Sequence, residues 1–288
     1  MTPAILDHAA DLLSRYDAVF CDVWGVVHNG RRAYAQAGEA LARFRAGGGS
    51  VILVSNAPIP AAGVERVLEK TGVRRDAWDA IVSSGDIALG HIAEKGYRRM
   101  HWVGPSERDY ALYVRLPAPS APLAEAEAIV CTGLRDDRRE TVADYSELIA
   151  EGVARGLPFV CANPDLVVDV GALRLPCAGS IAAEYERRGG KVFWAGKPHP
   201  AAYGTALRVA GELRGSTPPL SRILGIGDAV RTDLAAARGL GVDGLFIAAG
   251  IHTEDVLAGG AIDAGRLAAL FAHPDTPPAV AAMTHLRW

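Results

Sequence analysis

Polar side chains stand at the ends of two apolar segments in the first part of the chain. Asp22 and its neighbour Val23 end the run AVFCDV (18–23), and Ser55 and Asn56 end the run VILVSN. A carboxylate in such a position can serve as a nucleophile or as a metal ligand. A hydroxyl beside backbone N–H groups suits a phosphate oxygen, although Ser and Asn also favour ordinary turns.

Two more apolar segments, late in the chain, end in charged residues. Lys197 follows KVFWAG, and Asp228 ends RILGIGD with Asp233 five residues further on. A lysine at a buried strand exit provides a point charge for phosphate. Two acids at this spacing can serve one Mg²⁺ site, although Asp is also a favoured helix cap. Taken in order, these residues indicate metal-assisted phosphate chemistry.

The elements that must position these residues alternate between short apolar runs and helical patterns. The runs are rich in Val and Ile and often apolar on both faces, which is typical of parallel strands covered by helices. The sequence therefore predicts an α/β fold with a Rossmann-like parallel sheet, in which ligands bind outside the carboxyl ends of the strands. The predicted strands are 18–23, 50–55, 80–84, 99–104, 128–133, 158–163, 191–196, 222–228 and 244–250.

Helical patterns fill the intervals between the strands. They cover 35–49, 61–72 and 231–241, and another helix is expected to begin at Pro198. The N-terminal stretch reads as a further helix, with Thr2 as its N-cap and Pro3 in its first turn.

Nine strands are many for one simple sheet, which indicates an insertion. The chemically equipped strand ends come from the first and last parts of the chain, and a Pro-rich stretch lies between them at 117–128. The expected layout is a split core domain of residues 1–78 and 190–288, with an inserted α/β domain of residues 79–189.

Bulk properties exclude several classes of protein. With 288 residues the chain can bury a large core, and a net charge of −3 gives no sign of a nucleic-acid partner. No apolar run is long enough to span a membrane. The start of the chain lacks the pattern of a secretory signal, and the four cysteines form no CxxC pair. We therefore expect a cytoplasmic location with reduced, buried thiols.

The motifs in combination resemble the haloacid dehalogenase (HAD) superfamily. The chain carries a strand-end Asp22, a strand-end Ser55, GKPHP around Lys197 and GIGDAVRTD around Asp228, in the order of the four family motifs. With ANPD (162–165), the last two motifs are similar to the class IIA branch, which includes pyridoxal phosphate phosphatase and NagD-like enzymes. The late GIGDAV lacks the third glycine of a dinucleotide site, and no P-loop is present.

This resemblance implies roles for the site residues. Asp22 is the expected nucleophile that forms an aspartyl-phosphate, Ser55 holds the phosphoryl group, and Lys197 neutralises its charge. Asp228 binds Mg²⁺ with Asp22 and the backbone carbonyl of Trp24, and Asp233 supports the metal site. By the same resemblance, the inserted domain is expected to be a class IIA cap, and the substrate is expected to be a small phosphorylated metabolite. A homodimer formed through the cap is a further expectation.

Trp24 departs from the family pattern. Family phosphatases carry an aspartate two residues after the nucleophile. This aspartate first acts as an acid that protonates the leaving group and later acts as a base that activates water. The indole N–H of Trp24 is a donor only, and loss of a positioned acid or base typically costs about 10²–10⁴ in rate. His28, in the same turn, is the nearest substitute if it titrates near neutral pH, and His199 is a weaker one. A loop histidine that bonds locally or touches substrate is the preferred interpretation of His28.

The motifs and the departure at Trp24 leave two hypotheses for the function, which differ in whether the protein turns over a phosphorylated substrate. The first is a Mg²⁺-dependent phosphatase that works without the usual acid/base. The alternative is a catalytically weak or inactive module that binds Mg²⁺ and a phosphate ligand. A non-phosphate hydrolase is a minor third option, because haloacid dehalogenases carry an aromatic residue at the position of Trp24.

Overall fold

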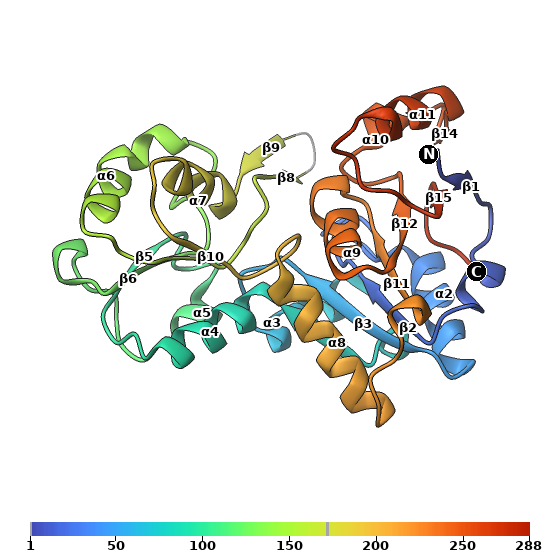
Figure 1. Cartoon of the computed structure of the whole chain (residues 1–288), viewed down its shortest axis with the longest axis horizontal. Helices are drawn as coiled ribbons and strands as arrows, with labels where there is room; N and C mark the ends of the chain where they lie inside the picture. The colour runs from blue at the N-terminus through green and yellow to red at the C-terminus, as the bar shows by residue number, and fades with distance from the viewer. Residues whose placement is uncertain (1, 171–172) are drawn as a thin grey trace. The chain divides into compact units, whose positions relative to one another are not determined.

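The nine predicted strands are all strands in the computed structural model, which describes residues 2–170 and 173–288 (Figure 1). Most of them end one to three residues earlier than expected. The observed bounds are β2 Ala18–Cys21, β3 Ser50–Ser55, β4 Ala80–Ser83, β5 Met100–Val103, β6 Ala128–Cys131, β7 Phe159–Cys161, β10 Val192–Trp194, β11 Ile223–Gly227 and β12 Asp243–Ile247.

The chain divides into two units, and the first comprises residues 1–55, 64–82 and 197–288. Its sheet has the strand order β1-β15-β12-β11-β2-β3-β4, in which β1 is Ala4–Ile5 and β15 is Ala281–Met283. Strand β2 lies between β11 and β3 and pairs with both in parallel. Their carboxyl ends therefore lie at one edge of the sheet, which brings the residues after them together.

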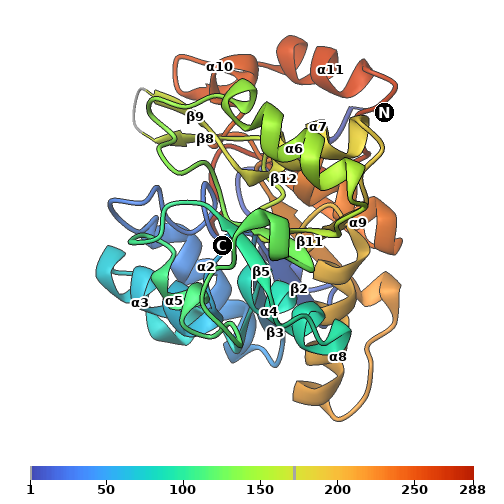
Figure 2. The same ribbon diagram turned by 90° about the vertical axis from the view of Figure 1, so that its left-hand side faces the viewer.

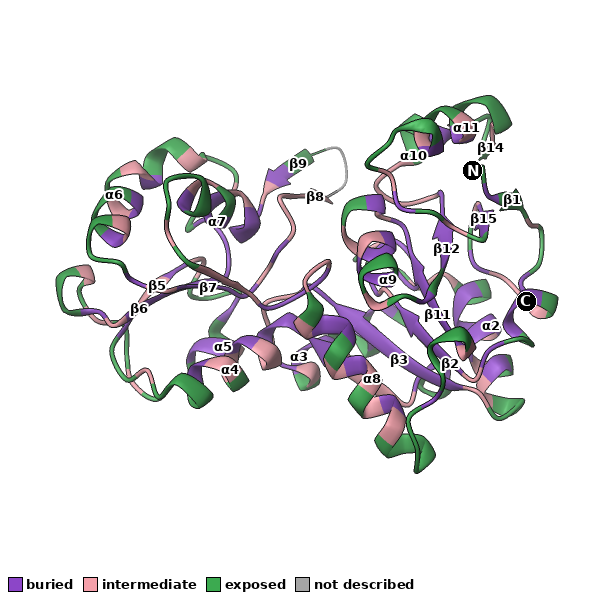
Figure 3. Ribbon diagram, in the orientation of Figure 1, coloured by how far each residue is buried: buried purple, intermediate pink, exposed green. Residues whose placement is uncertain are grey.

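Helices cover both faces of this sheet. Figure 2 shows α2 (Ala35–Ala46) on one side of β2, β3 and β11, with α8 (Pro200–Arg214) and α9 (Ala235–Leu240) on the other. Strands β2, β3 and β11 are buried along their length (Figure 3), as expected for runs that are apolar on both faces. The remaining helices of this part of the chain are α1 Ala10–Leu13, α3 Ala61–Thr71, α10 Thr253–Val256 and α11 Ala264–Ala272.

The second unit comprises residues 56–63 and 83–196 and has its own parallel sheet, in the order β10-β7-β6-β5. Alternate residues of β6 serve two cores. Ala128 and Val130 pack with α4 (Ser84–Lys95) and α5 (Tyr110–Tyr113). Ile129 and Cys131 pack with α6 (Ser146–Ala154) and α7 (Ala178–Arg187) on the opposite face.

Several short elements differ from the sequence-based expectation. The predicted N-terminal helix is wrong at its start, because Ala4–Ile5 pairs with β15 as a parallel edge strand and the helix begins only at Ala10. Helix α8 begins at Pro200 rather than at Pro198. The antiparallel pairs β8 (Val167–Val170) with β9 (Leu173–Pro176), and β13 (Leu257–Ala258) with β14 (Ala261–Ile262), were not expected.

Two expectations from bulk composition have structural counterparts. All four cysteines, at positions 21, 131, 161 and 177, are buried free thiols. Across 2–170 and 173–288, no helix combines the length and the apolar character needed to cross a lipid bilayer.

Candidate active site

Lys197 lies at the centre of a buried charge cluster in the first unit. Its Nζ donates to Asp22 Oδ1 and to Asp233 Oδ1, each at 2.6 Å, and only 2% of the residue is exposed. Burial by itself would lower the pKa of Lys197, but the two carboxylates outweigh it and hold that pKa well above its usual value. The lysine is therefore a permanent cation held between two acids.

Three carboxylates surround one point in this cluster. Asp22, Asp228 and Asp233 each present an oxygen atom, and these atoms all lie within 4.8 Å of one another. Burial, followed by repulsion from Asp22 and Asp233, raises the pKa of Asp228 well above its usual value. Burial and repulsion from Asp22 likewise raise the pKa of Asp233 to about 6, although Lys197 opposes this rise. One lysine facing three acids leaves negative charge that a cation would balance.

This donor set fits a divalent cation. Carboxylate oxygens are the hard ligands that Mg²⁺ prefers, and a metal ion is commonly the largest charge in such a site and reverses the local pKa shifts. The observation that supports the fit is the raised pKa of Asp228. Its carboxylate accepts the N–H of Ile251 at 2.9 Å, but among the contacts described for this part of the chain no lysine donates a hydrogen bond to it.

Glycines make room for the acids. A Cβ atom at Gly250 would lie 1.8 Å from Asp228 Oδ2, and one at Gly25 would lie 2.1 Å from the same atom. A Cβ at Gly227 would lie 2.1 Å from Asp233 Cβ. Gly25 also has a φ of +82°, which favours glycine. Gly25, Gly227 and Gly250 are therefore required by the close approach of the carboxylates.

We expect Gly250→Ala to weaken Mg²⁺ binding by about 10- to 100-fold, the usual effect of disturbing residues that orient metal ligands. The added methyl group must displace Asp228, and Gly250 does not have a positive φ that would add strain of its own. Titration calorimetry with Mg²⁺ checks this prediction. Gly239→Ala is the matched control, because a Cβ at Gly239 meets nothing within 4 Å. Equal Mg²⁺ affinity in both variants would contradict the placement of Asp228 at the metal.

Asp233 is held by an irregular turn. It lies in a π-helical turn, Val230–Leu234, that precedes α9, and its Oδ2 accepts the N–H of Ala229 at 3.1 Å. Wide turns of this kind are frequent at functional sites. Asp233 thus binds the backbone at the start of its turn with one oxygen and Lys197 with the other, instead of acting only as a helix cap.

Ser55 and Asn56 lie at the carboxyl end of β3, next to β2. Ser55 is buried as the last residue of the strand. Asn56 belongs to the second unit, where its side-chain Nδ2 donates to Asp165 Oδ1 at 2.8 Å. The sequence predicts Asn56 as a substrate-binding residue beside Ser55, and the structure shows that its side chain also binds Asp165.

Trp24 and His28 pack together in the loop that follows Asp22. Their rings meet edge to face with centroids 5.5 Å apart, and the indole lies over Gly30, where a Cβ would come within 2.2 Å of Trp24 Cη2. The ring of Trp24 is thus fixed by its own loop, with 38% of the residue exposed. No acid takes its place within this loop, since residues 23–34 contain no Asp or Glu.

His28 is buried and hydrogen-bonded within its own loop. It is 2% exposed, and its Nδ1 accepts the N–H of Gly30 at 2.8 Å, so the neutral ring carries its proton on Nε2. Burial lowers the pKa of His28 to about 4. The expectation that this histidine titrates near neutrality, as a substitute for the missing aspartate, is therefore wrong, and the local hydrogen bond fits the preferred interpretation.

The sequence reasoning missed two residues that shape the site. Gly250 and Ile251 follow β12 and contact Asp228, the first by leaving space and the second through its N–H. The signal was present, because the predicted strand GLFIAAG ends in a glycine at the same edge of the sheet. Unlike the ends of β2, β3 and β11, it offers no charged or hydroxyl side chain that would mark it as part of a site.

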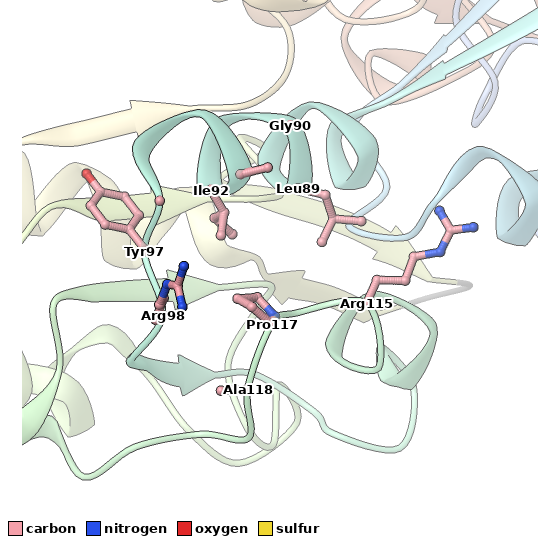
Figure 4. A pocket seen from close by; sticks show the side chains of 10 residues that line it. Leu89, Gly90, Ile92, Tyr97, Arg98, Arg115, Pro117 and Ala118 are labelled. Atoms are coloured by element: carbon pink, nitrogen blue, oxygen red, sulfur yellow. The ribbon is translucent and has the colours of Figure 1, made fainter.

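A separate cavity lies within the second unit. It has a volume of about 760 Å³ between α4 and the segment around Pro117, and its lining is mainly apolar, with Arg98 and Arg115 at its rim (Figure 4). None of the predicted site residues lines it. The catalytic assignment therefore rests on the charge cluster around Lys197.

Comparison with known proteins decides the family. The chain is 44% identical to a haloacid dehalogenase-like hydrolase from Brucella suis 1330 over 99% of both chains, with a TM-score of 0.83. The chain belongs to the haloacid dehalogenase-like hydrolase family. A family model described as haloacid dehalogenase-like hydrolase matches residues 19–112, and a second, HAD-hydrolase-like model matches residues 194–271.

More distant structures share the fold of this HAD hydrolase. A 4-nitrophenylphosphatase from Thermotoga maritima is 20% identical, with a TM-score of 0.68 over 95% of this chain and 96% of its own. NagD from E. coli K-12 is 20% identical, with a TM-score of 0.63 over 94% and 96% of the two chains. The resemblance to the class IIA branch is thus confirmed at the level of the fold.

One curated relative has a different description. The HAD hydrolase is 29% identical over 179 residues to an ATP phosphoribosyltransferase regulatory subunit from Anaeromyxobacter sp. (strain K). The match covers 58% of this chain and 46% of that protein, so the chain spans just under half the length of the curated relative it matches.

Proposed function

We propose that this HAD hydrolase is a Mg²⁺-dependent phosphatase of small phosphorylated metabolites. The observation that carries the proposal is the buried lysine joined to two of three clustered carboxylates. In phosphoryl transfer the protein mainly positions groups and neutralises charge, and this cluster supplies both functions. The phosphatases among the structures of similar fold support the same reaction class.

In this proposal Asp22 is the nucleophile. A carboxylate oxygen of Asp22 bonds to phosphorus while the bond from phosphorus to the leaving oxygen breaks. Ser55 and the backbone N–H of Asn56 hold the phosphoryl oxygens, and Lys197 neutralises their charge. Water then bonds to phosphorus, the aspartyl-phosphate bond breaks, and Asp22 is regenerated with release of phosphate.

Asp22, Asp228 and the backbone carbonyl of Trp24 would hold Mg²⁺, with Asp233 in support. The ion would supply Lewis-acid stabilisation of the transferring phosphoryl oxygens. Asp233 also holds Lys197 in place, because its carboxylate accepts a hydrogen bond from Lys197 Nζ at 2.6 Å. The second unit is proposed as the class IIA cap, which determines substrate selectivity. His28 would contact the substrate only if the loop that contains Trp24 reaches it.

The missing acid restricts the substrates. Without a carboxyl at position 24, the leaving oxygen departs without a proton from this loop, and His28 is neutral with a low pKa. We therefore infer a preference for phosphate esters and anhydrides whose leaving groups are stable as anions, such as aryl, enol or acyl phosphates.

The decisive experiment measures phosphate release from p-nitrophenyl phosphate and a panel of phosphorylated metabolites. It is run with Mg²⁺ and with EDTA, beside Asp22→Asn. Release that requires Mg²⁺ and vanishes in the variant supports the proposal. Binding of Mg²⁺ and phosphate without release would favour the alternative, a binding module, for which the absence of an acid at Trp24 is the supporting observation. Halide release from a haloacid would instead indicate the minor option.

We expect Trp24→Asp to raise turnover of an alkyl phosphate such as glycerol phosphate by about 10²-fold, because it restores a proton donor for a poor leaving group. Turnover of p-nitrophenyl phosphate is expected to change far less, since p-nitrophenolate needs no proton to leave. Steady-state kinetics on the two substrates checks this, with Trp24→Asn as the matched variant of similar size without an acid. Equal gains in the Asp and Asn variants would contradict an acid–base effect.

A further inference from the structure

The ANPD motif (162–165) contacts the residues that adjoin Ser55 and Lys197 in the sequence. It follows β7, and Asp165 Oδ1 accepts a hydrogen bond from Asn56 Nδ2 at 2.8 Å. Within the motif, Asn163 Oδ1 accepts the N–H of Asp165 at 3.2 Å, which fixes the turn. Asn56 comes directly after Ser55 in the sequence, so the motif binds the residue next to a proposed phosphate ligand.

The same turn contacts the residue before Lys197. A Cβ atom at Gly196 would lie 2.4 Å from Asn56 Oδ1 and 3.0 Å from the ring of Pro164. Gly196 therefore approaches both Asn56 and Pro164 as closely as only glycine can. Two chain segments far apart in sequence, one after Ser55 and one before Lys197, meet on this motif.

The turn is itself anchored in the second unit. The Asp165 carbonyl accepts the N–H of Gly179 in the first turn of α7 at 3.1 Å, and a Cβ at Gly179 would lie 2.5 Å from that oxygen. Beyond Asn56, the carbonyl of Ala57 accepts the N–H of Gly85 at 3.2 Å. The contacts on both sides connect the pair of Asn56 and Asp165 to the helices that pack on the sheet of the second unit.

We propose that the hydrogen bond between Asn56 and Asp165 is a positioning device for Ser55 and Lys197. Successive Cα atoms are about 3.8 Å apart, so a shift at Asn56 or Gly196 is passed directly to the neighbouring catalytic residue. A misplacement of about 1 Å can cost about 10²-fold in rate. Asp165 acts through these neighbours and is a positioning residue. Its effect on turnover rests on the phosphatase function proposed above.

The test is a reciprocal exchange of the two side chains. Asp165→Ala removes the acceptor, and Asn56→Asp places two carboxylates together. Each is expected to lower kcat by about 10- to 100-fold. The double variant Asn56→Asp with Asp165→Asn restores an amide facing a carboxylate in the reverse sense, and it is expected to recover about tenfold or more over Asn56→Asp alone. Asp136→Ala, which removes an exposed carboxylate of the same unit, is the control and should leave kcat unchanged.

Hydrogen exchange provides a second measurement that needs no turnover. In Asp165→Ala, peptides covering 50–57 and 193–200 should lose protection while α6 and α7 keep theirs. Full activity in Asp165→Ala and Asn56→Asp would overturn the proposal, as would lost protection throughout the second unit, which would indicate a merely structural role. If the wild-type protein shows no Asp22-dependent phosphate release, the phosphatase function fails. In that case hydrogen exchange in Asp165→Ala alone decides the proposal. Loss of protection confined to 50–57 and 193–200 would support the positioning device, and unchanged protection there would overturn it.

Discussion

Asp22→Asn is expected to abolish Mg²⁺-dependent phosphate release, with a loss of about 10⁴-fold or more. The amide has nearly the shape of the carboxylate and can still accept a hydrogen bond from Lys197, but it is a poor nucleophile toward phosphorus. The measurement is release from the best substrate of the panel at saturating Mg²⁺. Retained release would show that phosphorus is attacked by another group, such as water.

The same variant should remain folded, which separates chemistry from stability. Repulsion from Asp22 raises the pKa values of both Asp228 and Asp233, so its removal relieves two buried acids. We therefore expect the melting temperature of Asp22→Asn in EDTA to be at or above that of the wild type. Asp11→Asn, on the exposed face of α1, is the control for loss of one negative charge. A large fall in melting temperature only in Asp22→Asn would contradict the charge balance described here.

Much of the fold was predictable because it depends on local patterns. Val- and Ile-rich runs defined nine of the strands, and parallel pairing in the first unit then required the polar ends of β2, β3 and β11 to meet at one edge of that sheet. Asp22 and Asp233 were found in this way, because they follow β2 and β11 of that sheet. Lys197 follows β10, which belongs to the sheet of the second unit, but it lies within hydrogen-bond distance of both acids. The prediction followed from the period of the sequence and from the geometry of parallel sheets.

The remaining features depend on contacts between distant segments. The helix expected at Thr2 and Pro3 is replaced by a strand because β15, almost 280 residues later, offers an edge to Ala4–Ile5. The low pKa of His28 arises from burial, which a loop sequence does not reveal. The bond from Asn56 to Asp165 joins residues 109 positions apart. In each case the deciding partner lies outside any local window of the sequence.

Lys197→Met is expected to lower turnover by about 10²–10³-fold, the usual cost of removing one charge-stabilising donor from a transition state. Methionine keeps the apolar stem and nearly the volume, so the variant isolates the charge. It should also destabilise the fold by about 3–5 kcal/mol at pH 8, because breaking a buried ion pair leaves an uncompensated charge. Lys95→Met, at an exposed lysine, is the control for both measurements.

The pH dependence of this loss has a definite sign. Asp233 has a folded-state pKa of about 6, raised above its unfolded value, so the folded protein binds the proton more tightly and loses stability as pH rises from about 4 through 6. Lys197 opposes that rise in pKa, and without it the folded-state pKa moves higher and the loss extends to higher pH. Urea unfolding in EDTA should therefore show a smaller deficit for Lys197→Met at pH 5, where the acids can take up protons, than at pH 8. An equal deficit at both values would mean that Lys197 stabilises the fold by packing, and that the acids around it are not coupled to its charge.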